Sequence, residues 1–117
     1  MKLSDVSQTL TLTCLTPSLV AERESEISGG YASDLLSDVL ANAPSGGVLV
    51  TIQAHLNTVA VALHARQCAV IFATGRMPDV EVIARAQDER LPLYVSQQST
   101  FDVAGRLYAL GLRSERP

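Results

Sequence analysis

Apolar residues follow two different periods along this sequence. Short, uninterrupted aliphatic runs bounded by turn residues are typical of strands buried in a parallel sheet, whereas apolar residues spaced three to four positions apart indicate amphipathic helices. In the helix expected at 79–90, Val80, Val82, Ile83 and Ala86 would face the core. The predicted inner strands are 48–52, 69–73 and 92–95, and the predicted helices are 33–41, 57–66, 79–90 and 99–110.

The first thirty residues are less regular. Ser4 is placed to cap a helix that ends at Leu10, and residues 11–15 alternate as a strand would. Residues 20–27 carry four charged side chains and indicate an exposed strand or a connection. This segment ends at Gly29-Gly30, where we expect a tight backbone.

Strands that alternate with helices of this length predict βαβ units with right-handed crossovers. We therefore expect a single-domain, three-layer α/β fold with a mostly parallel sheet and helices on both faces. The domain would span residues 1–112, and residues 113–117 would form a polar C-terminal tail. With 117 residues, 47% of them hydrophobic, the chain can bury a core without a metal ion or a disulfide.

Charge and composition exclude several classes of function. A net charge of −3 provides no basic field for a phosphate backbone, so we expect no nucleic-acid binding. The start of the chain lacks the apolar core of a signal peptide, and no apolar stretch approaches the roughly 20 residues of a membrane span. Cys14 and Cys68 lie in apolar runs without CxxC spacing and are expected to be inert, which fits a reducing, cytoplasmic setting without membrane association.

Ligands of open parallel sheets bind where the strands end and loops meet helix N-termini. Residues 29–34, 53–58, 74–77 and 96–99 would form that edge, with Arg76 as its one cation. Backbone N–H groups together with Arg76 would suit a small anion such as phosphate. Ordinary helix caps at Ser33, Asn57 and Ser99 are the alternative. The candidate ligand-binding residues are Ser33, Asp34, His55, Asn57, Thr58, Thr74, Gly75 and Arg76.

Known catalytic patterns are missing. The sequence has neither G-x-G-x-x-G nor G-x-x-x-x-G-K-[ST], the fingerprints of nucleotide-binding loops. His55 and His64 lack the converging ligands of a zinc site. Asp34 and Asp38 have the i, i+4 spacing of solvated carboxylates on one face at the start of a helix. We therefore expect no catalytic residue, no metal ion and no cofactor.

Three segments resemble a DRTGG domain. They are Gly29-Gly30-Tyr31-Ala32-Ser33-Asp34 with the helix that follows to Ala43, Val50 to Asn57, and Phe101 to Leu107. The family's Gly-Asp-Arg and Thr-Gly-Gly segments are replaced here by Gln53-Ala54-His55 and Thr74-Gly75-Arg76.

The resemblance implies a fold similar to the N-terminal domain of HPr kinase/phosphorylase, which lacks that enzyme's P-loop. Such domains also accompany CBS domains in regulated pyrophosphatases and occur in some phosphotransacetylases, where they look like regulatory or dimerisation modules. The resemblance therefore implies a homodimer, with the helix at 57–66 either in the interface or in the core.

The sequence thus predicts a non-catalytic regulatory domain. It would sense a small anionic or nucleotide-like metabolite at the strand ends, or bind a partner protein. The alternative is a small phosphoryl- or acyl-transfer enzyme, in which Arg76 binds the anion and Asp34 or His55 acts as the base.

Overall fold

The computed structural model describes residues 1–115 and arranges them around a single five-stranded sheet. Each predicted inner strand is present, with ends that differ from the prediction by at most one residue. The elements are α1 (Leu3–Thr9), β1 (Thr13–Cys14), the 3₁₀ helix η1 (Ala21–Glu24), β2 (Gly29–Ala32), α2 (Leu36–Asn42), β3 (Gly47–Thr51), α3 (Leu56–His64), β4 (Ala69–Phe72), α4 (Val80–Asp88), β5 (Leu93–Val95) and α5 (Thr100–Ala109).

The strands lie in the order β1-β5-β4-β3-β2. Strands β2 to β5 are parallel, while the short strand β1 runs antiparallel to β5 at one edge. In the register, Val50 of β3 lies opposite Ala32 of β2 on one side and Ile71 of β4 on the other. The mostly parallel sheet expected from the sequence is confirmed.

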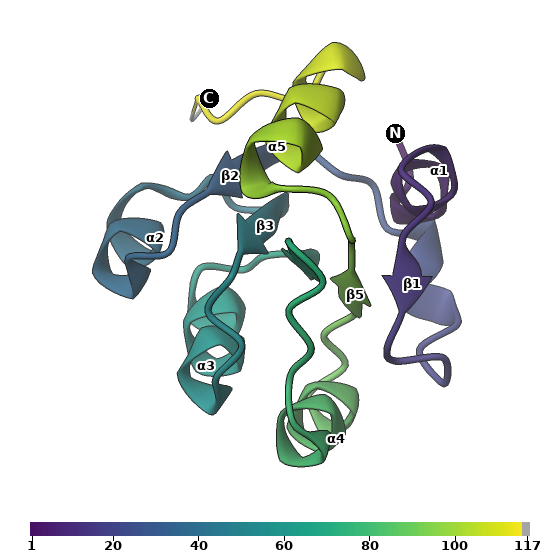
Figure 1. Cartoon of the computed structure of the whole chain (residues 1–117), viewed down its shortest axis with the longest axis vertical. Helices are drawn as coiled ribbons and strands as arrows, with labels where there is room; N and C mark the ends of the chain where they lie inside the picture. The colour runs from purple at the N-terminus through teal and green to yellow at the C-terminus, as the bar shows by residue number, and fades with distance from the viewer. Residues whose placement is uncertain (116–117) are drawn as a thin grey trace.

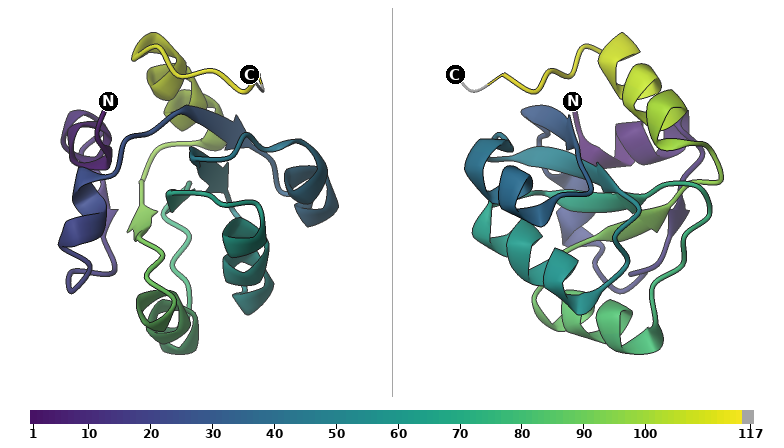
Figure 2. Two further views of the ribbon diagram at one scale, coloured as in Figure 1. Left: turned by 180° about the vertical axis from the view of Figure 1, so that it is seen from behind. Right: turned by 60° about the vertical axis from the view of Figure 1, so that its left-hand side comes forward.

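Helices cover both faces of this sheet (Figures 1 and 2). Because successive side chains of a strand point to opposite faces, Val48 and Val50 of β3 pack in the core beneath α1 and α5. Leu49, between them, packs in the second core beneath α2, α3 and α4. The three-layer α/β fold is therefore confirmed.

Gly29 and Gly30 both belong to strand β2. The strand needs glycine at position 29 for close packing. A Cβ atom on Gly29 would lie 2.5 Å from the carbonyl oxygen of Arg113. Strand β2 forms the edge of the sheet opposite β1.

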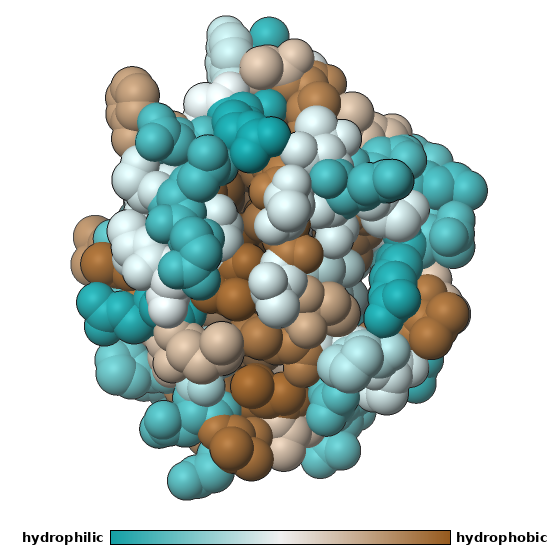
Figure 3. Space-filling model, turned by 45° about the vertical axis from the view of Figure 1, so that its right-hand side comes forward, coloured by the Kyte–Doolittle hydropathy of each residue, from teal (hydrophilic) through white to brown (hydrophobic). Residues whose placement is uncertain are grey.

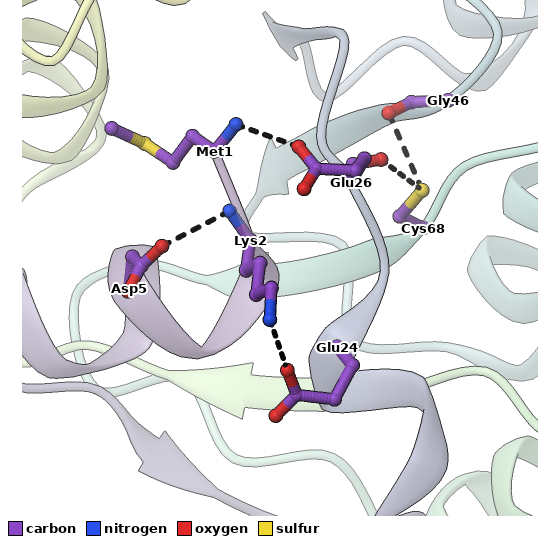
Figure 4. Close-up of polar contacts among 7 residues, drawn as sticks. All are labelled: Met1, Lys2, Asp5, Glu24, Glu26, Gly46 and Cys68. Atoms are coloured by element: carbon purple, nitrogen blue, oxygen red, sulfur yellow. Dashed lines mark hydrogen bonds and ion pairs between the residues drawn. The ribbon is translucent and has the colours of Figure 1, made fainter.

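Ion pairs join the first two residues of the chain to the segment that contains η1 and the residues after it (Figure 4). Lys2 Nζ lies 2.8 Å from a carboxylate oxygen of Glu24, and the Met1 nitrogen lies 2.8 Å from Glu26. The Asp5 carboxylate accepts the backbone N–H of Lys2 at the start of α1, so Ser4 is not its cap. The charged segment expected as an exposed strand or a connection is a connection between β1 and β2 that contains η1.

Both cysteines are partly buried and pack against the core beneath α1 and α5. Cys68 Sγ lies 3.3 Å from the carbonyl oxygen of Gly46, and burial raises the pKa of its thiol. No helix within residues 1–115 has the length and apolar character needed to cross a bilayer.

Candidate functional site

The loops that follow β2, β3, β4 and β5 all leave the same edge of the sheet, because these strands are parallel (Figure 1). We call this edge the rim; it comprises residues 33–35, 52–56, 73–79 and 96–99. The predicted segments at 53–58, 74–77 and 96–99 meet there. The segment at 29–34 contributes only Ser33 and Asp34, since the preceding residues form β2.

Asp34 connects the first two loops of the rim. One of its carboxylate oxygens accepts hydrogen bonds from the Thr51 hydroxyl and from the Ile52 N–H, each at 2.9 Å. The Asp34 carbonyl oxygen accepts a third from the Gln53 side chain at 3.1 Å. The carboxylate thus holds the loop after β2 against the loop after β3.

Ser33, Asn57 and Thr58 do not cap their helices. The Ser33 hydroxyl accepts the N–H of Leu35, one residue before α2 begins, and α3 begins at Leu56, before Asn57. Thr58 is buried, and its hydroxyl donates to the Gln53 carbonyl oxygen. Only the cap expected at Ser99 is confirmed, where the hydroxyl accepts the N–H of Asp102 at 3.1 Å.

Asp34 and Asp38 do not share a helical face, because α2 begins only at Leu36. Asp38 instead accepts hydrogen bonds from Asn42 Nδ2 at 2.8 Å and from the Tyr31 hydroxyl at 2.8 and 2.9 Å. These donors, led by Asn42, lower the pKa of Asp38. Among residues 1–115, no three His, Cys, Asp or Glu side chains gather as metal ligands would.

The loops after β4 and β5 are joined through their backbones. Thr74 N–H donates to Gln98 and Gly75 N–H donates to Ser96, both at 2.7 Å. Thr74 and Gly75 have φ angles of 57° and 65°, a region that favours glycine. A Cβ atom on Gly75 would lie 2.6 Å from Gln97 Oε1. This fixed turn carries Arg76, whose side chain is exposed.

Two helix N-termini at the rim keep unpaired backbone donors. The caps of α3 and α4, His55 and Asp79, accept no hydrogen bond through their side chains. The N–H groups of Leu56 and Asn57 in α3 find no acceptor in the described part of the chain, and those of Val80 and Glu81 in α4 find none there either. Since β3 and β4 are neighbours and α3 packs on α4, these two N-termini lie side by side with the Arg76 turn.

Apolar side chains also reach the surface around the rim. Val80, expected to face the core, is 82% exposed because it is the first residue of α4 and precedes the buried stripe. Phe101 is 84% exposed in the first turn of α5. Leu35, Leu56 and Met77 are exposed too. A space-filling view of one face shows an apolar band between polar side chains (Figure 3).

A concave surface lies between β2 and α5. This hollow, which we call the groove, has a volume of about 350 Å³. Its lining residues come from β2, β3, α5 and the segment after α5: Gly30, Tyr31, Ala32, Val50, Ala104, Leu107, Tyr108, Leu112, Arg113, Ser114 and Glu115.

The segment after α5 runs beside β2 (Figure 2), and Arg113 holds it there. Its carbonyl oxygen accepts the N–H of Gly30 at 3.0 Å, and its guanidinium group lies 3.5 Å from the ring centroid of Tyr108. Residues 113–115 are exposed, and residues 116–117 of the predicted tail lie outside the described residues. Reasoning from the sequence missed the groove because it did not assign Gly29-Gly30 to a strand. The alternation of small residues at Gly30 and Ala32 was the available signal.

No family model matches the sequence, and no curated protein matches it. Among solved structures, the CBS and DRTGG domains of the regulatory region of Clostridium perfringens pyrophosphatase, in complex with the activator diadenosine tetraphosphate, match with a TM-score of 0.68 and 14% identity. The match covers 97% of this chain and 48% of that chain. The chain has a DRTGG-like fold.

The fold brings the two segments that resemble altered DRTGG motifs into neighbouring loops. Gln53-Ala54-His55 follows β3 and Thr74-Gly75-Arg76 follows β4, so the neighbouring strands bring them to adjacent loops of the rim. The DRTGG-like domain spans about half the length of the pyrophosphatase regulatory region that it matches.

Proposed function

We propose that this chain is a non-catalytic regulatory domain that senses a small anionic or nucleotide-like metabolite at the rim. The observation that carries the proposal is that Arg76 lies at the same edge of the sheet as the N–H groups that begin α3 and α4. These N–H groups find no acceptor within residues 1–115. These donors come from two adjacent loops, and the turn before Arg76 is held by two backbone hydrogen bonds to the loop after β5.

Physical chemistry favours an anion at this position. A helix N-terminus carries a partial positive charge as well as free N–H donors. A guanidinium group adds a full charge and a planar set of donors that fits phosphate oxygens. His55 and Asn57 are exposed beside these groups and supply further polar contacts. A phosphate or a nucleotide's phosphate chain is therefore the ligand class that the rim suits.

The structural neighbour supports a nucleotide-like ligand, since that regulatory region was solved with a dinucleotide activator. The contacts of Asp34 favour sensing over catalysis, because its carboxylate already accepts two hydrogen bonds from the loop after β3. The enzyme alternative would then depend on His55 as its base. Turnover of a bound phosphoester, lost in His55→Ala, would favour that alternative.

The exposed apolar side chains around the rim favour a second candidate function, which is binding a partner protein. We propose a homodimer in the cytoplasm as the simplest such assembly. Thr58, Val59 and Ala62 of α3 are buried inside this domain, so an interface on α3 would use the opposite face of the helix. Light scattering at micromolar concentration tests the dimer, and a monomer would remove it.

Thermal denaturation with pyrophosphate and ATP tests the anion site. At a ligand concentration about a hundredfold above Kd, we expect the Tm to rise by at least about 4 °C. Arg76→Gln should weaken binding about tenfold or more, since it removes a charged donor. The matched control is Arg66→Gln, which alters another exposed arginine, after α3 and away from the rim.

Equal losses in both variants would indicate nonspecific attraction to positive charge and would contradict the rim site. If neither ligand shifts the Tm of the unmodified protein, the sensing proposal fails and binding of a partner protein becomes the better account.

A further inference from the structure

The groove between β2 and α5 exists because the residues that would fill it are small. Gly30 has no side chain, and Ala32 and Ala104 each carry one methyl group where the strand faces the helix. Leu107 contributes an apolar wall that reaches within 4.0 Å of the position a Gly30 Cβ would take. A volume of about 350 Å³ is within the range of small-molecule sites.

The edge of β2 provides polar groups beside this hollow. Backbone groups of a strand point alternately to its two sides. The N–H of Ser33 donates to Val50 in β3, whereas the N–H of Gly30 donates to Arg113 on the other side. Ala32 has the same orientation as Gly30, so its N–H and C=O point away from β3. No outward hydrogen bond from Ala32 occurs among the described residues.

These groups form a short recognition edge. The carbonyl of Gly30 and the N–H of Ala32 present an acceptor and a donor two residues apart. An amino-substituted heteroaromatic ring has the complementary pair, an exocyclic N–H donor next to a ring-nitrogen acceptor. The apolar wall of Leu107 and the methyl groups of Ala32 and Ala104 suit the flat faces of such a ring.

We infer that the groove is a second binding site, distinct from the rim, for the aminopurine base of a nucleoside or nucleotide. The base would pair with Gly30 and Ala32 at the edge of β2 and lie against α5. This site does not depend on the anion site at the rim, and either one can fail without the other.

The free edge is too short for an added peptide strand. Arg113 already occupies the outward N–H of Gly30, and β2 ends at Ala32, so only one residue can pair in full. A compact planar ligand needs no more than that.

Arg113 also places charge at the mouth of the groove. Its Nη1 donates to the carbonyl oxygens of Tyr108 and Leu112, while its Nη2 and Nε find no acceptor within residues 1–115. A 5′-phosphate would accept from those two nitrogens.

Titration of the ¹⁵N-labelled full chain with adenosine and with purine riboside, which lacks the 6-amino group, tests this site. Adenosine should shift the amide signals of Ala32, Ala104 and Leu107, and should bind at least about fivefold more tightly than purine riboside, because the latter leaves the Gly30 carbonyl unpaired. Equal affinities, or shifts confined to the rim, would overturn the inference.

Two pairs of variants locate the site. Ala104→Leu fills the groove and should abolish adenosine binding, while Ala109→Leu changes an exposed position of the same helix and should leave binding unchanged. Ala32→Pro removes the outward N–H without touching the β3 ladder and should weaken adenosine binding about fivefold or more. If Ala104→Leu disturbs folding, the test depends on Ala32→Pro alone. An adenosine affinity that is unchanged in Ala32→Pro would contradict the site.

A comparison of AMP with adenosine distinguishes phosphate binding at the groove from phosphate binding at the rim. AMP should bind more tightly than adenosine, and Arg113→Gln should remove that difference while Arg76→Gln keeps it. If Arg76→Gln removes the difference instead, the phosphate lies at the rim and the groove assignment is wrong.

Discussion

Strands β4 and β2 lie in the same sheet but are held there by different means. Each residue of β4, from Ala69 to Phe72, is buried, and its side chains fill both cores. Strand β2 has two glycines, a half-buried tyrosine and an exposed alanine. It is held by the ladder to β3, by the Tyr31–Asp38 hydrogen bond and by the carbonyl of Arg113.

The contrast shows where the fold leaves room for binding. A strand buried on both faces has no surface to offer, whereas the sparse side chains of β2 create the groove and its short free edge. Most residues of the rim likewise lie outside both cores, although Ala73 belongs to one core and Ile52 and Ala54 pack against them. Substitutions in the two strands should therefore differ in what they disturb.

Shortening a buried side chain of β4 should cause the largest loss of stability. Ile71 is fully buried, and Ile71→Ala should lower the free energy of unfolding by about 2–5 kcal/mol through lost burial and a residual cavity. Urea denaturation followed by circular dichroism measures the change. A loss below about 1 kcal/mol would show that β4 is not the centre of the core.

A larger side chain in β2 should lower the free energy of unfolding by less than Ile71→Ala does. It should also displace the segment after α5. Gly29→Ala places a methyl group 2.5 Å from the Arg113 carbonyl oxygen, so the segment after α5 must move, at a cost of about 1–3 kcal/mol. Hydrogen exchange of the Gly30 amide should accelerate, because its acceptor is displaced.

Gly105→Ala is the matched control for that variant. Nothing lies within 4 Å of a Cβ atom at this position, and Gly105 is inside α5. The substitution should therefore stabilise the protein by about 0.5–1 kcal/mol through helix propensity. Destabilisation of similar size in both variants would contradict the close contact described for Gly29.

Asp34→Ala tests how the rim loops are fastened. It leaves the buried Thr51 hydroxyl and the Ile52 N–H without their acceptor, which should cost about 1–2 kcal/mol. Asp88→Ala, at an exposed position at the end of α4, should change stability by less than about 0.5 kcal/mol. Equal effects would show that the Asp34 contacts contribute nothing specific.

The smallest expected effect is on the pH dependence of stability, through Asp38. Hydrogen bonds from Asn42 and Tyr31 lower the pKa of Asp38 from its ordinary value of 3.8, so they favour the carboxylate in the folded state. The stabilisation is present above pH 3.8 and is lost as pH falls through the lowered folded value. Asp38→Asn should flatten the acid limb of stability against pH, and an unchanged limb would contradict this role.

The inner strands and the rim were predictable because their signals are local. Val48 to Val50 and Ala69 to Phe72 are continuous apolar runs, and parallel strands place the loops after them at one edge. The cap at Ser33 was misassigned because its hydroxyl accepts from Leu35 just before the helix begins.

The groove was not predictable in the same way. Its strand depends on the contact between Gly30 and Arg113, residues far apart in the sequence, and glycine-rich edge strands lack the apolar period that identifies inner ones. Val80 follows the helical period but lies in the first turn of α4, where the core does not reach it.

The most direct test of the central proposal is a ¹⁵N NMR titration of the chain with pyrophosphate, followed at the backbone amides. We predict saturable shifts of Leu56, Asn57, Val80 and Glu81 that Arg76→Gln abolishes and Arg66→Gln preserves. Shifts spread over the exposed arginines without saturation, or none at the starts of α3 and α4, would contradict an anion site at the rim.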